Sequence, residues 1–132
     1  MKTRGVALLL ALFSLVIISL LVIAFLETTA IDLQIVSNQL NRNKALYIAD
    51  AGIEDAVSRI INRNRGFSNQ IVQLPSGSGN TYNVTYVLSS GKITSTGTLV
   101  SGEHVDLEAK VSVTGSSPFV VKILYWREPP PT

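Results

Sequence analysis

The chain contains no cysteine and a single histidine among its 132 residues. It therefore cannot form a disulfide, a cysteine zinc site or a thiol nucleophile, and it has no pair of histidines to hold a metal. Charged residues make up only 15%, and eleven Lys and Arg against nine Asp and Glu leave a formal charge of +2. Lys2 and Arg4 supply that excess, so the basic balance does not indicate nucleic-acid binding. These absences argue against most enzyme classes, and we expect no catalytic residue, cofactor or metal.

Residues that break helices are also scarce in the first half of the chain. Pro75 is the first proline, and Gly52 is the only glycine between residues 6 and 65. Apolar residues recur there at steps of three and four, the spacing of one helical face. The sequence predicts one helix from about Val6 to about Asn64, roughly 90 Å long at 1.5 Å per residue. We expect its second part to pack on the rest of the chain through Leu46, Ala49, Gly52, Ile53, Ala56, Val57 and Ile60.

The helix begins with an apolar run. Residues 5–26 contain no charge in 22 positions, and Ser14 and Ser19 are the only interruptions. A bilayer core of roughly 30 Å requires about 20 such residues as a helix. Lys2 and Arg4 precede the run, so the positive-inside tendency puts the amino terminus in the cytoplasm and the rest across the membrane.

Three interpretations of this run are open. A cleaved secretory signal has a shorter apolar core followed by a small-residue site, which LETTAIDL at 26–33 does not offer. A plain signal anchor fits the composition. A prepilin leader would be the short basic segment MKTRG, cut between Gly5 and Val6, and glycine has no side chain to hinder a peptidase.

Beyond the helix, we expect a connector at 68–79 and then four short antiparallel strands joined by tight turns. The expected strands are TYNVTYVL at 81–88, KITSTGTLV at 92–100, EHVDLEAKVSV at 103–113 and FVVKILYW at 119–126, followed by an extended tail. Alternation places Tyr82, Val84, Tyr86, Leu88, Val105, Leu107, Ala109, Val111 and Val113 toward the core, and Asp106, Glu108 and Lys110 outward. The predicted fold is α+β, with the second part of the helix covering the apolar face of the sheet.

These residues together resemble a known family. The leader TRG, the opening VALLLALF at 6–13, the block KALYIADAGIEDAVSRI at 44–60 and the strand–turn–strand segment at 93–113 are similar to type IV pilins and pseudopilins, and among them to PilX-like minor pilins. The resemblance covers most of the chain. It implies segments at 1–5 (leader), 6–26 (membrane-spanning and filament-core helix), 27–65 (amphipathic helix) and 66–132 (β-domain with a proline-rich tail).

The resemblance implies a structural role. A prepilin peptidase would cut after Gly5 and leave Val6 as the mature, usually N-methylated, amino terminus. The subunit would wait as a single-pass protein of the inner membrane until an assembly platform and its ATPase move it into a helical filament on the cell surface. There it would contact other copies of itself or other pilins. The expected filament-core residues are Leu8, Leu9, Leu10, Leu12, Phe13, Leu15, Val16, Leu20 and Phe25.

One position departs from the family pattern. Major pilins usually carry Glu at the fifth mature position, which here is Leu10. An apolar residue there is associated with minor or tip subunits. A major pilin, a minor pilin and a secretion pseudopilin therefore all stay open. So does a different class of protein, a single-pass anchored binding module whose β-domain holds a ligand or partner.

The remaining polar and aromatic residues have plain interpretations. We expect His104 to be exposed beside a turn. We expect a solvated or intersubunit face formed by Asp50, Glu54 and Asp55. The helix end should be capped by Arg59, Arg63 and Arg65, in preference to DNA binding by these residues. Asn83 fits a glycosylation sequon but lies in an expected strand. Tyr82, Tyr86 and Tyr125 are expected in the sheet core, and Trp126 could be exposed. Gly52 indicates a close approach to another backbone, either of the sheet or of a neighbouring subunit.

Overall fold

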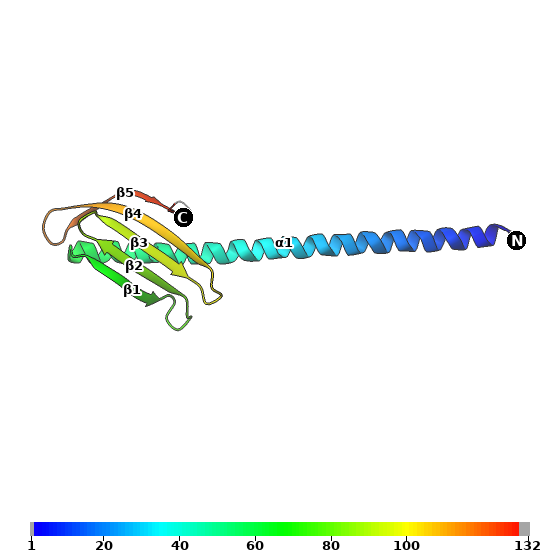
Figure 1. The fold of residues 1–132 in the computed structure, drawn as a ribbon, viewed down its shortest axis with the longest axis horizontal. Coiled ribbons are helices and arrows are strands. Elements are labelled where there is room, and N and C mark those ends of the chain that lie inside the picture. The colour runs from blue at the N-terminus through cyan, green and yellow to red at the C-terminus, as the bar shows by residue number, and fades with distance from the viewer. Residues whose placement is uncertain (1, 130–132) are drawn as a thin grey trace. The chain divides into compact units, whose positions relative to one another are not determined.

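The structure is a computed structural model that describes residues 2–129, with side chains from residue 5 onward. One α-helix, α1, runs from Lys2 to Asn62, which confirms the long helix and ends it two residues before the predicted position. The chain forms two compact units, residues 1–39 and 40–132. The described residues of the first unit are helix alone, and the second unit joins the carboxyl-terminal part of α1 to a β-sheet (Figure 1).

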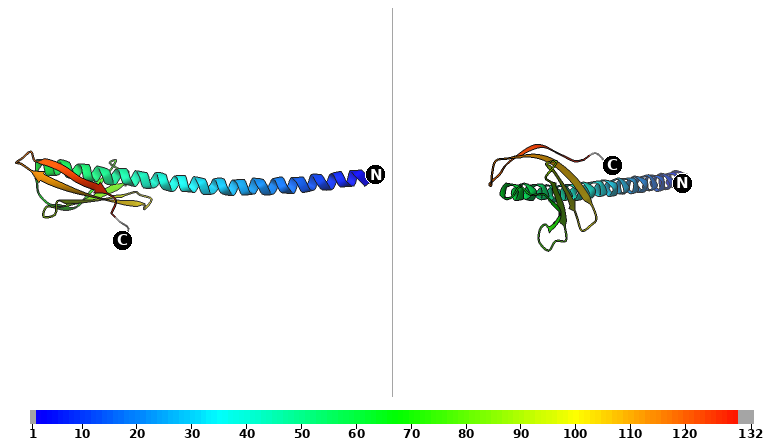
Figure 2. Two further views of the ribbon diagram at one scale, coloured as in Figure 1. Left: turned by 90° about the horizontal axis from the view of Figure 1, so that it is seen from above. Right: turned by 60° about the vertical axis from the view of Figure 1, so that its left-hand side comes forward.

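The sheet is an antiparallel meander of five strands in the order β1-β2-β3-β4-β5. Their bounds are Phe67–Gln73, Thr81–Val87, Lys92–Thr98, His104–Thr114 and Val120–Arg127. The α+β class is therefore confirmed, but the expected count of four strands is wrong. In the second unit, α1 lies against one face of this sheet (Figure 2).

Strand β1 lies where a connector was expected. Its sequence, FSNQIVQ, lacks regular apolar alternation, and the pairing with β2 shifts register between Phe67 and Gln70. Asn69 in this irregular stretch has φ 52°, a backbone conformation that asparagine tolerates better than most residues. Ladder hydrogen bonds to β2, not an apolar pattern of its own, make this segment a strand.

The core lies between α1 and the central strands. Tyr82, Val84, Leu107 and Ala109 are buried there, in the alternating pattern that the sequence predicts, and Ile93 of β3 is buried with them. One expectation is wrong. Leu88 is 51% exposed, because β2 ends one residue earlier and Leu88 lies in the turn. Glu108 points away from the helix, as expected, but it is only 8% exposed because neighbouring side chains cover it on the outer face of the sheet.

Helix and sheet touch through small residues. A Cβ atom on Gly52 of α1 would collide with the Ser95 hydroxyl oxygen and with the ring of Tyr82. A Cβ on Gly97 of β3 would collide with the backbone of Ala45 and Ala49. Within this chain, Gly52 therefore approaches the sheet, which is one of the two interpretations left open for it.

The end of α1 is held by the loop between β4 and β5. The Phe119 amide donates to the Ile61 carbonyl at 2.8 Å, and the Ser117 hydroxyl donates to the Asn62 carbonyl at 3.1 Å. The last carbonyls of a helix have no partner within the helix itself. The loop supplies two of the missing donors, so these carbonyls do not depend on arginine side chains.

Candidate functional site: the assembly surfaces

Three surfaces of the described residues are candidates for a functional role. They are the apolar surface of α1 from residue 5 to residue 26, the helix face that the sheet covers, and a groove between α1 and β5. No group of three or more His, Cys, Asp or Glu side chains among the described residues could hold a metal ion.

The apolar surface of α1 is fully open in the described chain. All the expected filament-core side chains are more than half exposed: Leu8, Leu9, Leu10, Leu12, Phe13, Leu15, Val16, Leu20 and Phe25. The helix is long and apolar enough to cross a membrane. Large exposed apolar surfaces on soluble proteins mark contact sites, and one of this length requires lipid or other protein.

The polar groups within this surface are satisfied inside the helix. The hydroxyls of Ser14 and Ser19 donate to the carbonyls of Leu10 and Leu15 at 2.8 Å, and Thr28 and Thr29 bond in the same way at 3.0 and 2.9 Å. An unsatisfied polar group in hydrocarbon costs several kcal/mol. Because these four hydroxyls already have acceptors, they do not hinder insertion into lipid or into a helix bundle.

Gly5 is not required by the packing of the chain. A Cβ atom built there would meet no described atom within 4 Å, and the adjacent Val6 is exposed. An alanine would also favour a helix over glycine by about 1 kcal/mol. The described contacts of the chain therefore give no reason for glycine at this position.

The helix face that the sheet covers contains every residue expected to pack there. Ala49, Gly52, Ile53, Ala56 and Ile60 are buried, and Leu46 and Val57 are partly buried against the same cluster. The covered face begins at Ala45, so the sheet does not cover the whole amphipathic stretch of the helix. Five large apolar residues before it stay exposed: Ile31, Leu33, Ile35, Val36 and Leu40.

Hydrogen bonds fix one edge of this covered face. The Tyr82 hydroxyl donates to the Asp55 carboxylate at 3.1 Å, and Arg59 pairs with the same carboxylate at 2.9 Å. Burial and the nearby Asp55 charge raise the pKa of Tyr82. Arg59 also lies over the Phe67 ring, 5.9 Å from its centroid. Asp55 and Arg59 thus serve the internal structure of the domain and are not free to form a site with Asp50.

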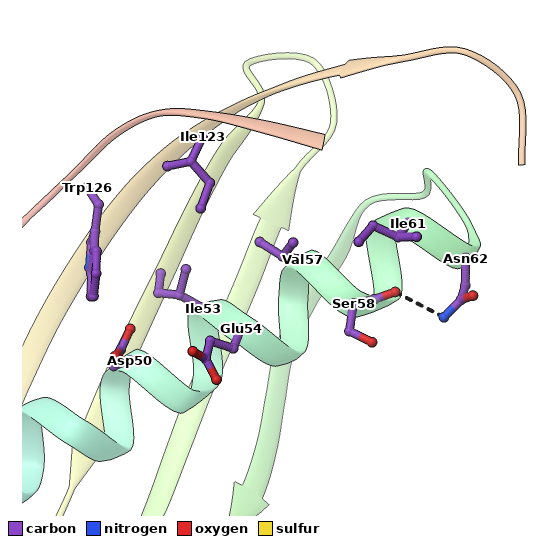
Figure 3. A pocket seen from close by; sticks show the side chains of 9 residues that line it. All are labelled: Asp50, Ile53, Glu54, Val57, Ser58, Ile61, Asn62, Ile123 and Trp126. Carbon is purple, nitrogen blue, oxygen red and sulfur yellow. Dashed lines mark hydrogen bonds between the residues drawn. The ribbon is translucent and has the colours of Figure 1, made fainter. Parts of the chain in front are cut away.

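The groove between α1 and β5 is a feature that sequence patterns did not reveal. Its volume is about 440 Å³, and it is lined by Asp50, Ile53, Glu54, Val57, Ser58, Ile61, Asn62, Ile123 and Trp126. Ile123 and Trp126 project from β5 toward α1 (Figure 3). They remain 48% and 52% exposed although they lie on the helix-facing side of the sheet.

A β-bulge places Trp126 in this groove. Strict alternation on β5 would group Ile123 with Tyr125, but the pairing with β4 shifts register between Lys110 and Val111. Ile123 pairs with Val111 and Trp126 with Ala109, both core positions of β4. Tyr125 consequently lies on the outer face, where its hydroxyl donates to Glu108 at 2.8 Å. The expectation that Tyr125 belongs to the core is wrong, because a bulge moves the later residues of β5 to the opposite faces.

The other residues noted in the sequence lie apart from these surfaces. His104 is exposed at the start of β4, as expected. Asn83 lies within β2 and is half-buried. Arg63 and Arg65 are exposed beyond the end of α1.

Comparison of the chain with protein-family models, with curated proteins and with solved structures gave no match. Function is therefore inferred from the residues of the chain itself.

Proposed function

We propose that this chain is a pilin-like structural subunit of a type IV pilus or a related extracellular filament. The observation that carries the proposal is that the two parts of α1 have different surroundings. The same helix exposes an apolar surface over residues 5–26, interrupted only by Ser14 and Ser19, and packs on an antiparallel sheet over residues 45–60. A helix of this kind can be held in a bilayer and later exchange lipid for the helices of other subunits.

The energetics are consistent with such an exchange. Burying a large aliphatic or aromatic side chain contributes on the order of 2 kcal/mol, and the gain is similar in lipid and in an apolar helix bundle. Because Ser14 and Ser19 keep their hydrogen bonds to the helix in both environments, transfer leaves no polar group unpaired. A subunit waiting in the inner membrane can thus enter a filament without a large free-energy difference between the two states.

The leader supports a prepilin pathway over a plain anchor. Gly5 meets no described atom that would require glycine, but a peptidase acting between Gly5 and Val6 would require it. Leu10 points to a minor subunit, because the glutamate expected of a major pilin at that position is missing. A buried carboxylate without a partner would be costly in lipid, and Leu10 avoids that penalty.

The test is the intact mass and amino-terminal sequence of the protein from the surface fraction of its native cells. We expect a chain that begins at Val6 and carries a methyl group. A chain that begins at Met1 would contradict the proposal and favour a single-pass anchored binding module instead.

A paired substitution sharpens this test. Gly5→Phe should block cleavage and filament entry while the β-domain stays folded, because a Cβ atom added at residue 5 meets no described atom within 4 Å. Ala11→Phe places the same side chain within the apolar run and should leave cleavage unchanged. If uncut Gly5→Phe protein is still found in filaments, the leader assignment is wrong.

A further inference from the structure

The groove between α1 and β5 combines three features that suit one chemical group. Trp126 offers a half-exposed indole, Ile123 and Ile53 form an apolar wall, and Asp50 and Glu54 place two carboxylates at the rim (Figure 3). A guanidinium group can stack on an aromatic ring and pair with carboxylates at the same time, which an ammonium group does less well. The chemistry of the groove therefore suits an arginine side chain.

The two carboxylates have no internal counterion among the described residues. Asp50 and Glu54 are four residues apart on α1, so they lie on one face of the helix and repel each other. None of the salt bridges formed by the described side chains includes either residue. Burial and the charge of Glu54 raise the pKa of Asp50, as expected for a carboxylate that lacks a cation.

The same chain also has exposed arginines that lack a carboxylate partner in the described structure. Arg63 and Arg65 follow the end of α1, both are exposed, and neither belongs to a salt bridge within the described part of the chain. The carbonyls at the helix end are already bonded by Phe119 and Ser117, so neither arginine is required as a cap. These two side chains are free to extend away from the domain.

From this complementarity we propose that the groove between α1 and β5 receives Arg63 or Arg65 of a second copy of this chain. Asp50 and Glu54 lie within α1, whereas Arg63 and Arg65 follow its last residue, Asn62, which also lines the groove. The acidic and the basic groups are therefore different residues of the surface, so the contact is head-to-tail. A head-to-tail contact does not saturate in a dimer, because each copy still offers one free groove and one free helix end. Wherever copies of this chain are neighbours in a filament, the contact can therefore continue from one copy to the next. The inference thus rests on the proposed function and adds to it a contact between the outer domains.

The experiment reverses the charges in the full chain in its native cells. One variant changes the groove (Asp50→Lys with Glu54→Lys), one changes the helix end (Arg63→Glu with Arg65→Glu), and a third combines all four substitutions. We measure the amount of the chain in sheared filaments and, in the same cells, cleavage at Gly5. Each reversal alone should lower incorporation by about tenfold, and the combined variant should recover most of it, because opposite charges meet again.

Matched controls separate this contact from a general effect of charge. Asp106→Lys and Lys110→Glu reverse exposed charges on the outer face of β4 and should leave incorporation unchanged. Arg63→Lys with Arg65→Lys keeps the charge but loses the planar guanidinium, so it should lower incorporation less than the charge reversal. If Asp50→Lys disturbs folding, Glu54→Lys alone replaces it, because the Glu54 side chain is exposed.

Two results would overturn the inference while the proposed function stands. The first is normal incorporation of both reversed variants with normal cleavage. The second is a combined variant that incorporates no better than either reversal alone. A native chain that is neither cleaved nor found in filaments would instead overturn the proposed function, and the contact between copies would fall with it.

Discussion

Gly97 of β3 lies directly against the backbone of Ala49 of α1. A Cβ built on Gly97 would come within 2.5 Å of the Ala49 amide nitrogen and would also collide with the Ala45 carbonyl. Neither atom can move aside as the end of a flexible side chain could. At this point, helix and sheet can approach so closely because residue 97 has no side chain.

Gly97→Ala should destabilise the domain by about 3 kcal/mol or more, at the upper end of the range for overpacked cores. Thr94→Ala, on the exposed face of the same strand, should change stability by no more than about 1 kcal/mol. The measurement is thermal unfolding of the full chain in detergent, followed by near-ultraviolet circular dichroism of the tyrosines. Equal unfolding temperatures for Gly97→Ala and the unsubstituted chain would show that helix and sheet are not in such close contact.

From the contact at Gly52 we predict that substitutions at Gly52 and Ser95 have coupled effects on stability. The Ser95 hydroxyl is buried, has no hydrogen-bond partner in the described part of the chain, and is the nearest atom to the site of a Cβ on Gly52. An unsatisfied buried hydroxyl costs about 1–3 kcal/mol. Ser95→Ala should therefore leave stability unchanged or raise it.

Gly52→Ala should destabilise the domain less in the Ser95→Ala background than in the natural chain. The difference, measured as a double-mutant cycle of unfolding free energies, should be about 1 kcal/mol, as for other residues in direct contact. Part of the penalty should remain, because the ring of Tyr82 also lies 2.9 Å from the added atom. Strict additivity of the two substitutions would contradict the close approach of Gly52 to Ser95.

The sequence patterns predict this region of the fold well, because the signals are local. The three- and four-residue steps from Ala49 to Ile60 and the alternation on β2 and β4 each describe one face of one element. Two features are not local. Strand β1 depends on hydrogen bonds to β2, and the groove depends on a bulge that moves Trp126 to the face of Ile123. A register shift involves two strands, so no pattern within one of them reveals it.

We expect the folded domain to lose stability in acid because of the contacts of Glu108. Hydrogen bonds from Lys92 and from the Tyr125 hydroxyl, each 2.8 Å long, hold the pKa of Glu108 below its usual value of 4.5. A carboxyl whose pKa is lowered by folding stabilises the folded state above its unfolded pKa. That contribution should be present at neutral pH and should disappear as the pH falls below 4.5 toward the folded value.

Glu108→Gln should lower the unfolding temperature near neutral pH and flatten its decline below pH 4.5, because the variant has no carboxylate to protonate. The matched control is Glu54→Gln, which alters an exposed carboxylate outside the salt bridges of the described residues. Unfolding temperatures of the full chain in detergent, measured from pH 3 to about pH 8, give both profiles. Parallel profiles for Glu108→Gln and the natural chain would show that the contacts of Glu108 do not stabilise the carboxylate.

The division of the chain near residue 40 leads us to predict that the second unit folds without the first. Every buried core residue lies between Ala45 and Val111, within the second unit. A fragment of residues 40–132 should therefore fold without the apolar helix and unfold within about 4 °C of the full chain in detergent, a difference of only ~1 kcal/mol for a domain of this size. Ile60→Asp in the same fragment places a charge at a fully buried position and should abolish cooperative unfolding. A fragment that lacks a cooperative transition while the full chain shows one would mean that residues before Leu40 contribute to the stability of the domain, contrary to the packing described here.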